Sequence, residues 1–237
     1  MNRKRIWELD ALRGVLILLV IGAHGLFDAV YLYRILDWEF PPLYMAITAF
    51  GGALFPWMSG ISVTLGSHCV KRGLTVFAGG MIITAVTLGM YFLNFADADI
   101  IIYFGVLHCL GVCMLCWPLF KKLPVWALAS IGTALLLAGI AVRNVRVNTW
   151  LLVPLGLVPY GFASSDYFPL MPHLGIFLLG AVLGKTLYAS KTTRFPKVNT
   201  ENPVVRFFCF CGKHSLLVYL IHQPILSLIF WLIANAR

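Results

Sequence analysis

The stretch DALRGVLILLVIGAHGLFDAVYLY, residues 10–33, decides the fold, because an apolar run of about 20 residues is long enough to cross a bilayer. Three ionisable side chains interrupt it, namely Arg13, His24 and Asp28. Arg13 and His24 are eleven residues apart, which is close to three turns at about 3.6 residues per turn, so they share a helix face. Asp28 follows His24 at i+4, within reach of a hydrogen bond. Ionisable groups at membrane depth are costly and indicate function, so this segment is predicted to be the active-site helix.

Composition predicts an all-α, polytopic membrane protein. Of the 237 residues, 60% are hydrophobic and 11% charged, and the mean hydropathy of +0.88 excludes a soluble globular domain. The apolar runs are long rather than alternating, which favours helices over a barrel. About seven transmembrane helices are expected, near residues 10–33, 43–67, 73–94, 100–120, 125–142, 169–188 and 214–235.

The basic residues predict the orientation. The net charge is +9, but the bases gather in alternate loops, which is the positive-inside pattern rather than a nucleic-acid-binding stripe. A cytoplasmic N-terminus and an extracytoplasmic C-terminus leave only Arg34, Arg143, Arg146 and Arg237 of the 18 Lys and Arg residues outside. The other fourteen are Arg3, Lys4, Arg5, Arg13, Lys71, Arg72, Lys121, Lys122, Lys185, Lys191, Arg194, Lys197, Arg206 and Lys213. The expected location is the inner (cytoplasmic) cell membrane, crossed many times.

Several segments carry signals beyond hydropathy. Gly180 and Gly184 have the GxxxG spacing that indicates close helix packing. Residues 148–172 are apolar but broken by prolines, which predicts an extracytoplasmic re-entrant or interfacial segment that packs on protein or lines a cavity. Residues 189–207 are polar and basic and are expected to form the most flexible cytoplasmic loop.

The spacing of Arg13 and His24 resembles the Arg-x10-His signature of membrane acyltransferases that move acyl groups from the cytoplasm onto extracytoplasmic sugars. Four further segments resemble one branch, the bacterial relatives of heparan-alpha-glucosaminide N-acetyltransferase. They are FPWMSGISVTLG (55–66), IIYFGVLHCLGV (101–112), DYFPLMPHLGIFLLGAVLG (166–184) and KHSLLVYLIHQPIL (213–226). The resemblance covers most of the chain and implies a single transmembrane acyltransferase domain over residues 1–237.

The resemblance implies roles for the membrane helix residues. His24 would be the catalytic base, and Asp28, one turn away, would orient its imidazole and stabilise the imidazolium. Arg13 would hold the acyl-CoA donor, although from the sequence alone it also fits an anchor at the headgroups or a partner of Asp10. Further CoA contacts are expected from bases and polar residues at the cytoplasmic side, namely Lys71, Arg72, Lys213, His214 and Ser215. These basic groups fit anionic lipid equally well, and Ser215 also fits a helix cap.

Four more residues are predicted to line the acceptor path: His108, Asp166, His173 and His222. The two histidines within apolar motifs, His108 and His222, would join His24 in a polar pore. Hydrogen bonds that only hold helices together are the alternative for both of them.

The function predicted is transfer of an acetyl or other acyl group from cytoplasmic acetyl-CoA to an amino or hydroxyl group of an extracytoplasmic sugar or glycan. A small transporter or channel with a His/Asp/Arg relay is one alternative. A haem protein with two axial histidines is the other.

No metal is expected, although Cys109, Cys113 and Cys116 share a helix face. The expected partners are acyl-CoA, the glycan and membrane lipid, without nucleic acid. Because seven spans are fewer than larger relatives are expected to have, the chain is expected to be either a minimal catalytic core or a form completed by homodimerisation.

Overall fold

The structure, a computed structural model, describes residues 5–236, with the side chains at positions 45 and 49 excepted. The described part is all-α, as predicted, and its only β-structure is two isolated bridges. Three short helical turns, η1 (Asp28–Leu32), η2 (Ala98–Ile100) and η3 (Val153–Leu155), accompany eight α-helices. The helices are α1 (Trp7–Phe27), α2 (Pro42–Leu65), α3 (Cys69–Phe92), α4 (Val106–Phe120), α5 (Val125–Val142), α6 (Leu170–Thr186), α7 (Pro203–Lys213) and α8 (Ser215–Asn235).

Within the described residues, five helical segments are long and apolar enough to cross a membrane. They are Trp7–Leu32, Pro42–Leu65, Cys69–Phe92, Val125–Val142 and Ser215–Asn235. Two shorter apolar helices, α4 and α6, coincide with the other two predicted spans. The chain is therefore a membrane-integral helical protein. The count of seven spans and the orientation stay predictions, and Arg3, Lys4 and Arg237 of the charge pattern lie outside the described residues.

The chain divides into two compact units, each of which is described on its own. Unit 1 comprises residues up to Leu54 and from Lys191 onward, and unit 2 runs from Phe55 to Ser190. The boundary falls inside α2. The prediction of a single domain over the whole chain stays a prediction.

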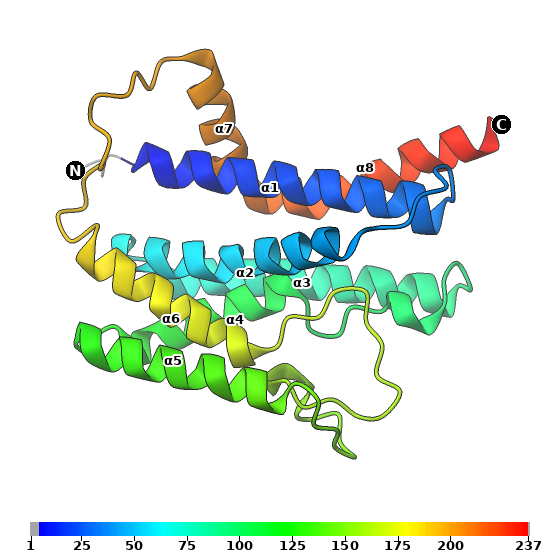
Figure 1. Cartoon of the computed structure of the whole chain (residues 1–237), viewed down its shortest axis with the longest axis horizontal. Coiled ribbons are helices and arrows are strands. Elements are labelled where there is room, and N and C mark those ends of the chain that lie inside the picture. Colours follow the sequence, from blue (N-terminus) through cyan, green and yellow to red (C-terminus); the bar gives the residue numbers. More distant parts are fainter. Residues whose placement is uncertain (1–4, 237) are drawn as a thin grey trace. The chain divides into compact units, whose positions relative to one another are not determined.

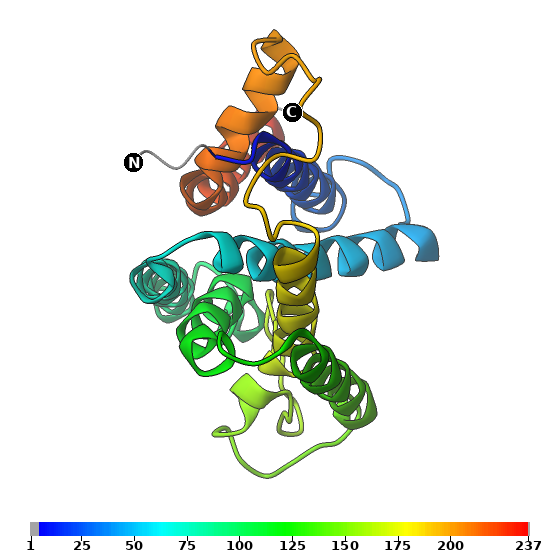
Figure 2. The same cartoon turned by 90° about the vertical axis from the view of Figure 1, so that its left-hand side faces the viewer.

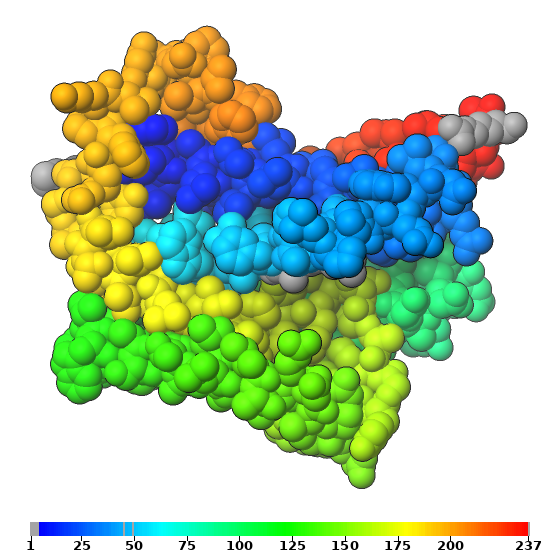
Figure 3. Space-filling view, viewed as in Figure 1, coloured from blue at the N-terminus to red at the C-terminus, as the bar shows by residue number. Residues whose placement is uncertain are grey.

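In unit 1, α7 and α8 both pack against α1, α7 near its N-terminal end and α8 near its C-terminal end (Figures 1 and 2). Glycines make the first contact close: an added methyl on Gly14 would overlap the carbonyl of Phe208, and one on Gly212 would overlap that of Asp10. Farther along, Gly25 faces Leu226 and Phe230. The space-filling view shows α7 (orange) lying directly on α1 (blue) (Figure 3).

In unit 2, glycines again allow two helices to pack closely. Gly180 and Gly184 of α6 lie against the backbone of α2 at Trp57 and Ile61, as the GxxxG spacing predicted. Helix α5 packs on α6, and α3 packs on α4. The core between α4, α5 and α6 includes Phe177 and Leu128, whose side chains are fully buried.

Helix α4 starts later than predicted, at Val106 rather than near residue 100. The physical reason is a cap that comes from far along the chain. The Asp166 carboxylate accepts a hydrogen bond from the Val106 N–H at 3.0 Å, which satisfies a donor that the first turn leaves open. Gly105 makes room for that carboxylate, because a methyl there would overlap Asp166 Oδ2.

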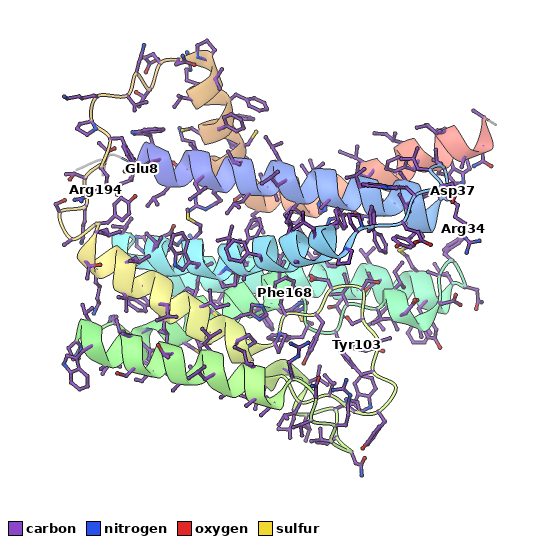
Figure 4. All side chains as sticks on the ribbon, in the orientation of Figure 1. Glu8, Arg34, Asp37, Tyr103, Phe168 and Arg194 are labelled. Atoms are coloured by element: carbon purple, nitrogen blue, oxygen red, sulfur yellow. The ribbon has the colours of Figure 1, made fainter. Side chains whose placement is uncertain are left out.

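The two predicted loop segments have different outcomes. The residues between α5 and α6 pack on protein, as expected, with Val153 and Val158 buried. The cytoplasmic loop prediction was wrong in its last part, because α7 begins at Pro203, where Asn202 caps the Val204 N–H at 2.9 Å. The loop before α7 is bound to α1. The backbone N–H of Arg194 donates a hydrogen bond to the Glu8 carboxylate at 2.8 Å, and Figure 4 labels both residues.

Candidate active site

Four polar side chains meet between the C-terminal end of α1 and the middle of α8, all within unit 1. His24 Nδ1 lies 2.7 Å from His222 Nε2, and Gln223 Nε2 donates to Asp28 Oδ2 at 2.8 Å. The two imidazole rings are stacked, with centroids 5.0 Å apart. We call these four residues the polar cluster. Two consecutive residues of α8 thus contact two residues that lie one turn apart on the first membrane helix.

The helix changes its geometry at the polar cluster. α1 ends at Phe27 and continues from Asp28 as a π-helical turn, closed by the Tyr33 N–H donating to the Asp28 carbonyl at 2.8 Å. The Asp28 side chain is buried, with 2% of the residue exposed. This wider turn ends the helix, because residues 33–41 are not helical. The turn is anchored to α8 by the Tyr33 hydroxyl, which donates to the Ser227 carbonyl at 3.0 Å.

The hydrogen bonds assign the protons of the two imidazoles. His222 Nδ1 lies 2.6 Å from the carbonyl oxygen of Tyr219, which can only accept, so Nδ1 carries the proton. Because an unpaired charge away from water is costly, we treat the pair as uncharged, and His222 Nε2 is then an acceptor. His24 must donate to it from Nδ1. The Nε2 atom of His24 therefore keeps its lone pair, and no described residue forms a hydrogen bond with it.

This arrangement gives His24 the form that a general base needs. In serine hydrolases a carboxylate accepts from Nδ1 of the catalytic histidine, which leaves Nε2 ready to take a proton. Here His222 provides the acceptor. The predicted hydrogen bond between Asp28 and His24 was wrong, because Gln223 takes the carboxylate and His222 takes the imidazole. Sequence reasoning missed Gln223, although a polar amide inside an apolar span was a signal for it.

The same geometry bears on the haem alternative. Two axial imidazoles would hold their ligating nitrogens about 4 Å apart, at twice a metal–nitrogen bond of about 2 Å. His24 and His222 are in direct contact at 2.7 Å, so in this arrangement they do not form such a pair. Within the described residues, no group of three or more His, Cys, Asp or Glu side chains is placed to hold a metal ion.

Arg13 lies three turns before His24 and pairs with a buried carboxylate. Its Nη1 is 3.1 Å from Asp10 Oδ1, and Arg5 Nη1 is 3.8 Å from Asp10 Oδ2. Asp10 itself is only 6% exposed. The alternative that Asp10 pairs with Arg13 is confirmed. A donor-binding role is compatible with this pair, because a guanidinium has five N–H donors.

Three of the other predicted CoA contacts lie at the junction of α7 and α8. Lys213 ends α7, His214 stands between the helices with its ring 4.7 Å from that of Phe210, and Ser215 begins α8. This junction adjoins the Arg13 turn, because Gly212 contacts the Asp10 backbone. Lys71 and Arg72 belong to unit 2, at the start of α3. Their role in binding CoA stays a prediction.

His108 differs from His24 because both of its ring nitrogens have partners. Nδ1 accepts from the Gly105 N–H at 3.2 Å, and Nε2 lies 3.3 Å from the Thr84 hydroxyl. The hydroxyl in turn donates to the Ile102 carbonyl at 2.6 Å. His108 is 2% exposed. The hydrogen bonds of this residue thus join α3, α4 and the segment before α4, which is what its structural alternative expected.

Asp166 lies on the segment that leads into α6, and His173 lies in the first turn of α6, in the same unit as His108. Asp166 caps α4, as described above. His173 Nδ1 lies 2.7 Å from the Pro169 carbonyl, and its ring packs 4.8 Å from that of Phe168. Both therefore have structural contacts, and contact of Asp166, His173, His108 or His222 with an acceptor stays a prediction.

The comparison with protein families shows to which family the chain belongs. The model of the family described as heparan-alpha-glucosaminide N-acetyltransferase, catalytic, matches residues 5–224. The chain belongs to this family. The matched range contains all four residues of the polar cluster. Comparison with curated proteins gave no match, and neither did comparison with solved structures. Membership of this N-acetyltransferase family makes the chain a membrane-integral acyltransferase, as the sequence motifs predicted.

Proposed function

We propose that the protein transfers an acetyl group from cytoplasmic acetyl-CoA to an amino or hydroxyl group of an extracytoplasmic sugar. His24 is the general base. The observation that carries this assignment is the 2.7 Å contact of His24 Nδ1 with His222 Nε2. It leaves His24 Nε2 with a lone pair in the first membrane helix of an N-acetyltransferase family member.

In the proposed step, the acceptor attacks the thioester carbonyl directly. His24 Nε2 takes the proton from the attacking amine or hydroxyl, the new N–C or O–C bond forms, and the C–S bond to CoA breaks. The leaving thiolate then receives the proton from the imidazolium. His222 holds the productive tautomer throughout. Asp28, buried one turn farther along, stabilises the positive charge that His24 carries between these two proton transfers.

The donor is proposed to bind at the cytoplasmic end of α1. Arg13, Lys213 and His214 come from adjacent elements there, and cationic groups suit the phosphates of CoA. Arg13 and His24 are eleven positions apart, a rise of about 16.5 Å at about 1.5 Å per residue. That distance would let the thioester reach the membrane interior while the nucleotide stays in the cytoplasm. Location in the inner cell membrane and homodimer formation stay predictions.

A transfer assay tests the function. Purified protein in detergent is incubated with radiolabelled acetyl-CoA and, separately, glucosamine, N-acetylglucosamine and glucose, and labelled sugar is separated from CoA. The proposal expects labelled product and an equal amount of free CoA thiol with at least one acceptor. Absence of product with every acceptor, together with no binding of CoA by calorimetry, would contradict it and favour the transporter alternative.

A further inference from the structure

Unit 2 contains a cavity that is lined by none of the residues given a role in the proposed reaction. It has a volume of about 280 Å³ and lies between the C-terminal end of α5, the irregular segment after it and the start of α6. Gly139, Arg143, Arg146, Phe162, Tyr167 and Met171 are among its lining residues. We call it the α5 pocket. Its size is slightly below that of pockets that hold drug-sized ligands, which begin at about 300 Å³, so it suits a headgroup or a single sugar.

The charge of the α5 pocket is unbalanced. Arg143 and Arg146 line it, and among the described residues neither guanidinium forms an ion pair with a carboxylate. Arg146 Nη1 donates to the carbonyls of Arg143 and Val145, at 3.3 and 3.4 Å. These two long hydrogen bonds use one nitrogen of the guanidinium and lie at the end of α5. Both side chains are exposed, so their remaining donors are open to a ligand.

Aromatic rings form another wall. The Phe162 ring is 4.9 Å from that of Tyr167 and 5.8 Å from that of Trp150, and Tyr103 joins the same cluster at 5.2 Å from Trp150. Figure 4 labels Tyr103 beside this segment. Burial raises the pKa of Tyr167 to about 12, although nearby Arg146 acts in the opposite direction. The phenol therefore stays neutral at physiological pH, and its hydroxyl donates to the Val153 carbonyl at 2.6 Å.

The pocket is held in place by backbone contacts. An added methyl on Gly139 would contact the backbone of Pro172, so α5 and α6 meet closely at the pocket floor. On the opposite side, the Val147 N–H donates to the Val158 carbonyl at 3.2 Å. The segment that carries Phe162 and Tyr167 is thereby tied to the segment that carries the arginines. A preformed site loses less free energy to ordering when a ligand binds.

We propose that the α5 pocket binds a small molecule or headgroup that carries a phosphate or carboxylate on an apolar or sugar-like body. The two guanidinium groups would form charge-assisted hydrogen bonds with the oxyanion, and Phe162 and Tyr167 would contact the body. Its residues are not those proposed to hold CoA at Arg13, Lys213 and His214, which belong to unit 1, whereas the α5 pocket lies in unit 2. The inference does not depend on His24 or on acyl transfer.

Two probes distinguish the possible sources of the oxyanion. Calorimetry with glycerol 3-phosphate tests a free solute, and native mass spectrometry of protein mixed with phosphatidylglycerol or phosphatidylcholine tests a lipid headgroup. Each is measured for the natural protein and for the double variant Arg143→Gln/Arg146→Gln. Arg194→Gln/Arg206→Gln, which removes two exposed positive charges elsewhere, is the matched control. Arg143→Lys/Arg146→Lys keeps the positive charges but removes the bidentate guanidinium geometry. It replaces the glutamine double variant in the test if that variant does not fold.

Loss of charge-assisted hydrogen bonds should weaken binding at least tenfold in the glutamine double variant, less in the lysine variant, and not in the control. An effect on glycerol 3-phosphate supports a solute ligand. An effect only on retention of phosphatidylglycerol over phosphatidylcholine supports a lipid. The proposal is overturned if neither probe distinguishes the glutamine variant from the natural protein, or if the control loses as much binding.

Discussion

His24 Nδ1 lies 2.7 Å from His222 Nε2, a contact that joins two helices across 198 residues of sequence. If this contact fixes the tautomer of His24, replacing His222 with Ala should lower kcat by about 10²-fold or more, because the base would then populate the unproductive tautomer. His222→Gln should recover part of the rate, since its side-chain carbonyl can accept from Nδ1. The test is kcat and KM of both variants, alongside ¹⁵N NMR of the His24 ring.

The NMR measurement separates positioning from structure. The natural protein should show the His24 proton on Nδ1, and His222→Ala should show a mixture of tautomers with unchanged helical content. Should His222→Ala keep its full kcat, or should His24 carry its proton on Nε2 in the natural protein, the positioning role is wrong.

Hydropathy could predict α1 to α6 and α8, because each long apolar run is a local signal, but it did not predict α7, which begins inside a polar, basic segment. Local spacing also provided the pair Arg13–Asp10, as an alternative to donor binding. The polar cluster could not be predicted in this way. The i+4 spacing predicted that Asp28 bonds to His24. The partners observed are His222 and Gln223 of α8, which only the packing of α1 on α8 brings into contact with them. The Asp166 cap of α4 has the same cause, since 60 residues separate it from Val106.

Arg13→Ala should weaken CoA binding by about 1.5–3 kcal/mol, the range for a hydrogen bond to a charged group. Arg13→Lys should recover only part of this, because it restores charge without the fork. Isothermal titration with CoA measures both. Arg5→Ala is a suitable control, because Arg5 is more exposed and also faces Asp10. Unchanged CoA affinity in Arg13→Ala would leave Arg13 as a membrane anchor paired with Asp10.

Close packing of α1 on α7 predicts a strong difference between two glycines. Gly212→Ala should lower the free energy of unfolding by about 1–3 kcal/mol, as overpacking does, because the methyl would overlap the Asp10 carbonyl. Gly22→Ala is the matched control. Nothing lies within 4 Å of a methyl there, and alanine favours a helix by up to about 1 kcal/mol. Denaturation in mixed detergent micelles should rank Gly212→Ala well below Gly22→Ala, and equal stabilities would contradict the packing described.

The charge pattern predicts which side of the membrane each loop faces. In a protein whose six cysteines are replaced by alanine, Thr200→Cys should react with a membrane-impermeant thiol reagent only from the cytoplasmic side. Leu36→Cys should react only from outside. Both positions are exposed and lie outside the helices. Labelling on the opposite sides would reverse the orientation and the proposed path of the acyl group.

The role of His24 as the base is tested most directly by acetyl transfer in His24→Ala. We compare labelled product formation from acetyl-CoA in the natural protein, in His24→Ala and in the control His68→Ala. His68 is the N-cap residue of α3, but its side chain is exposed and makes no capping hydrogen bond. Loss of a general base should reduce the rate by about 10²–10⁴-fold, while CoA affinity and helical content stay unchanged and His68→Ala keeps its activity. If His24→Ala retains more than half of the natural turnover, His24 is not the base of this acyltransferase.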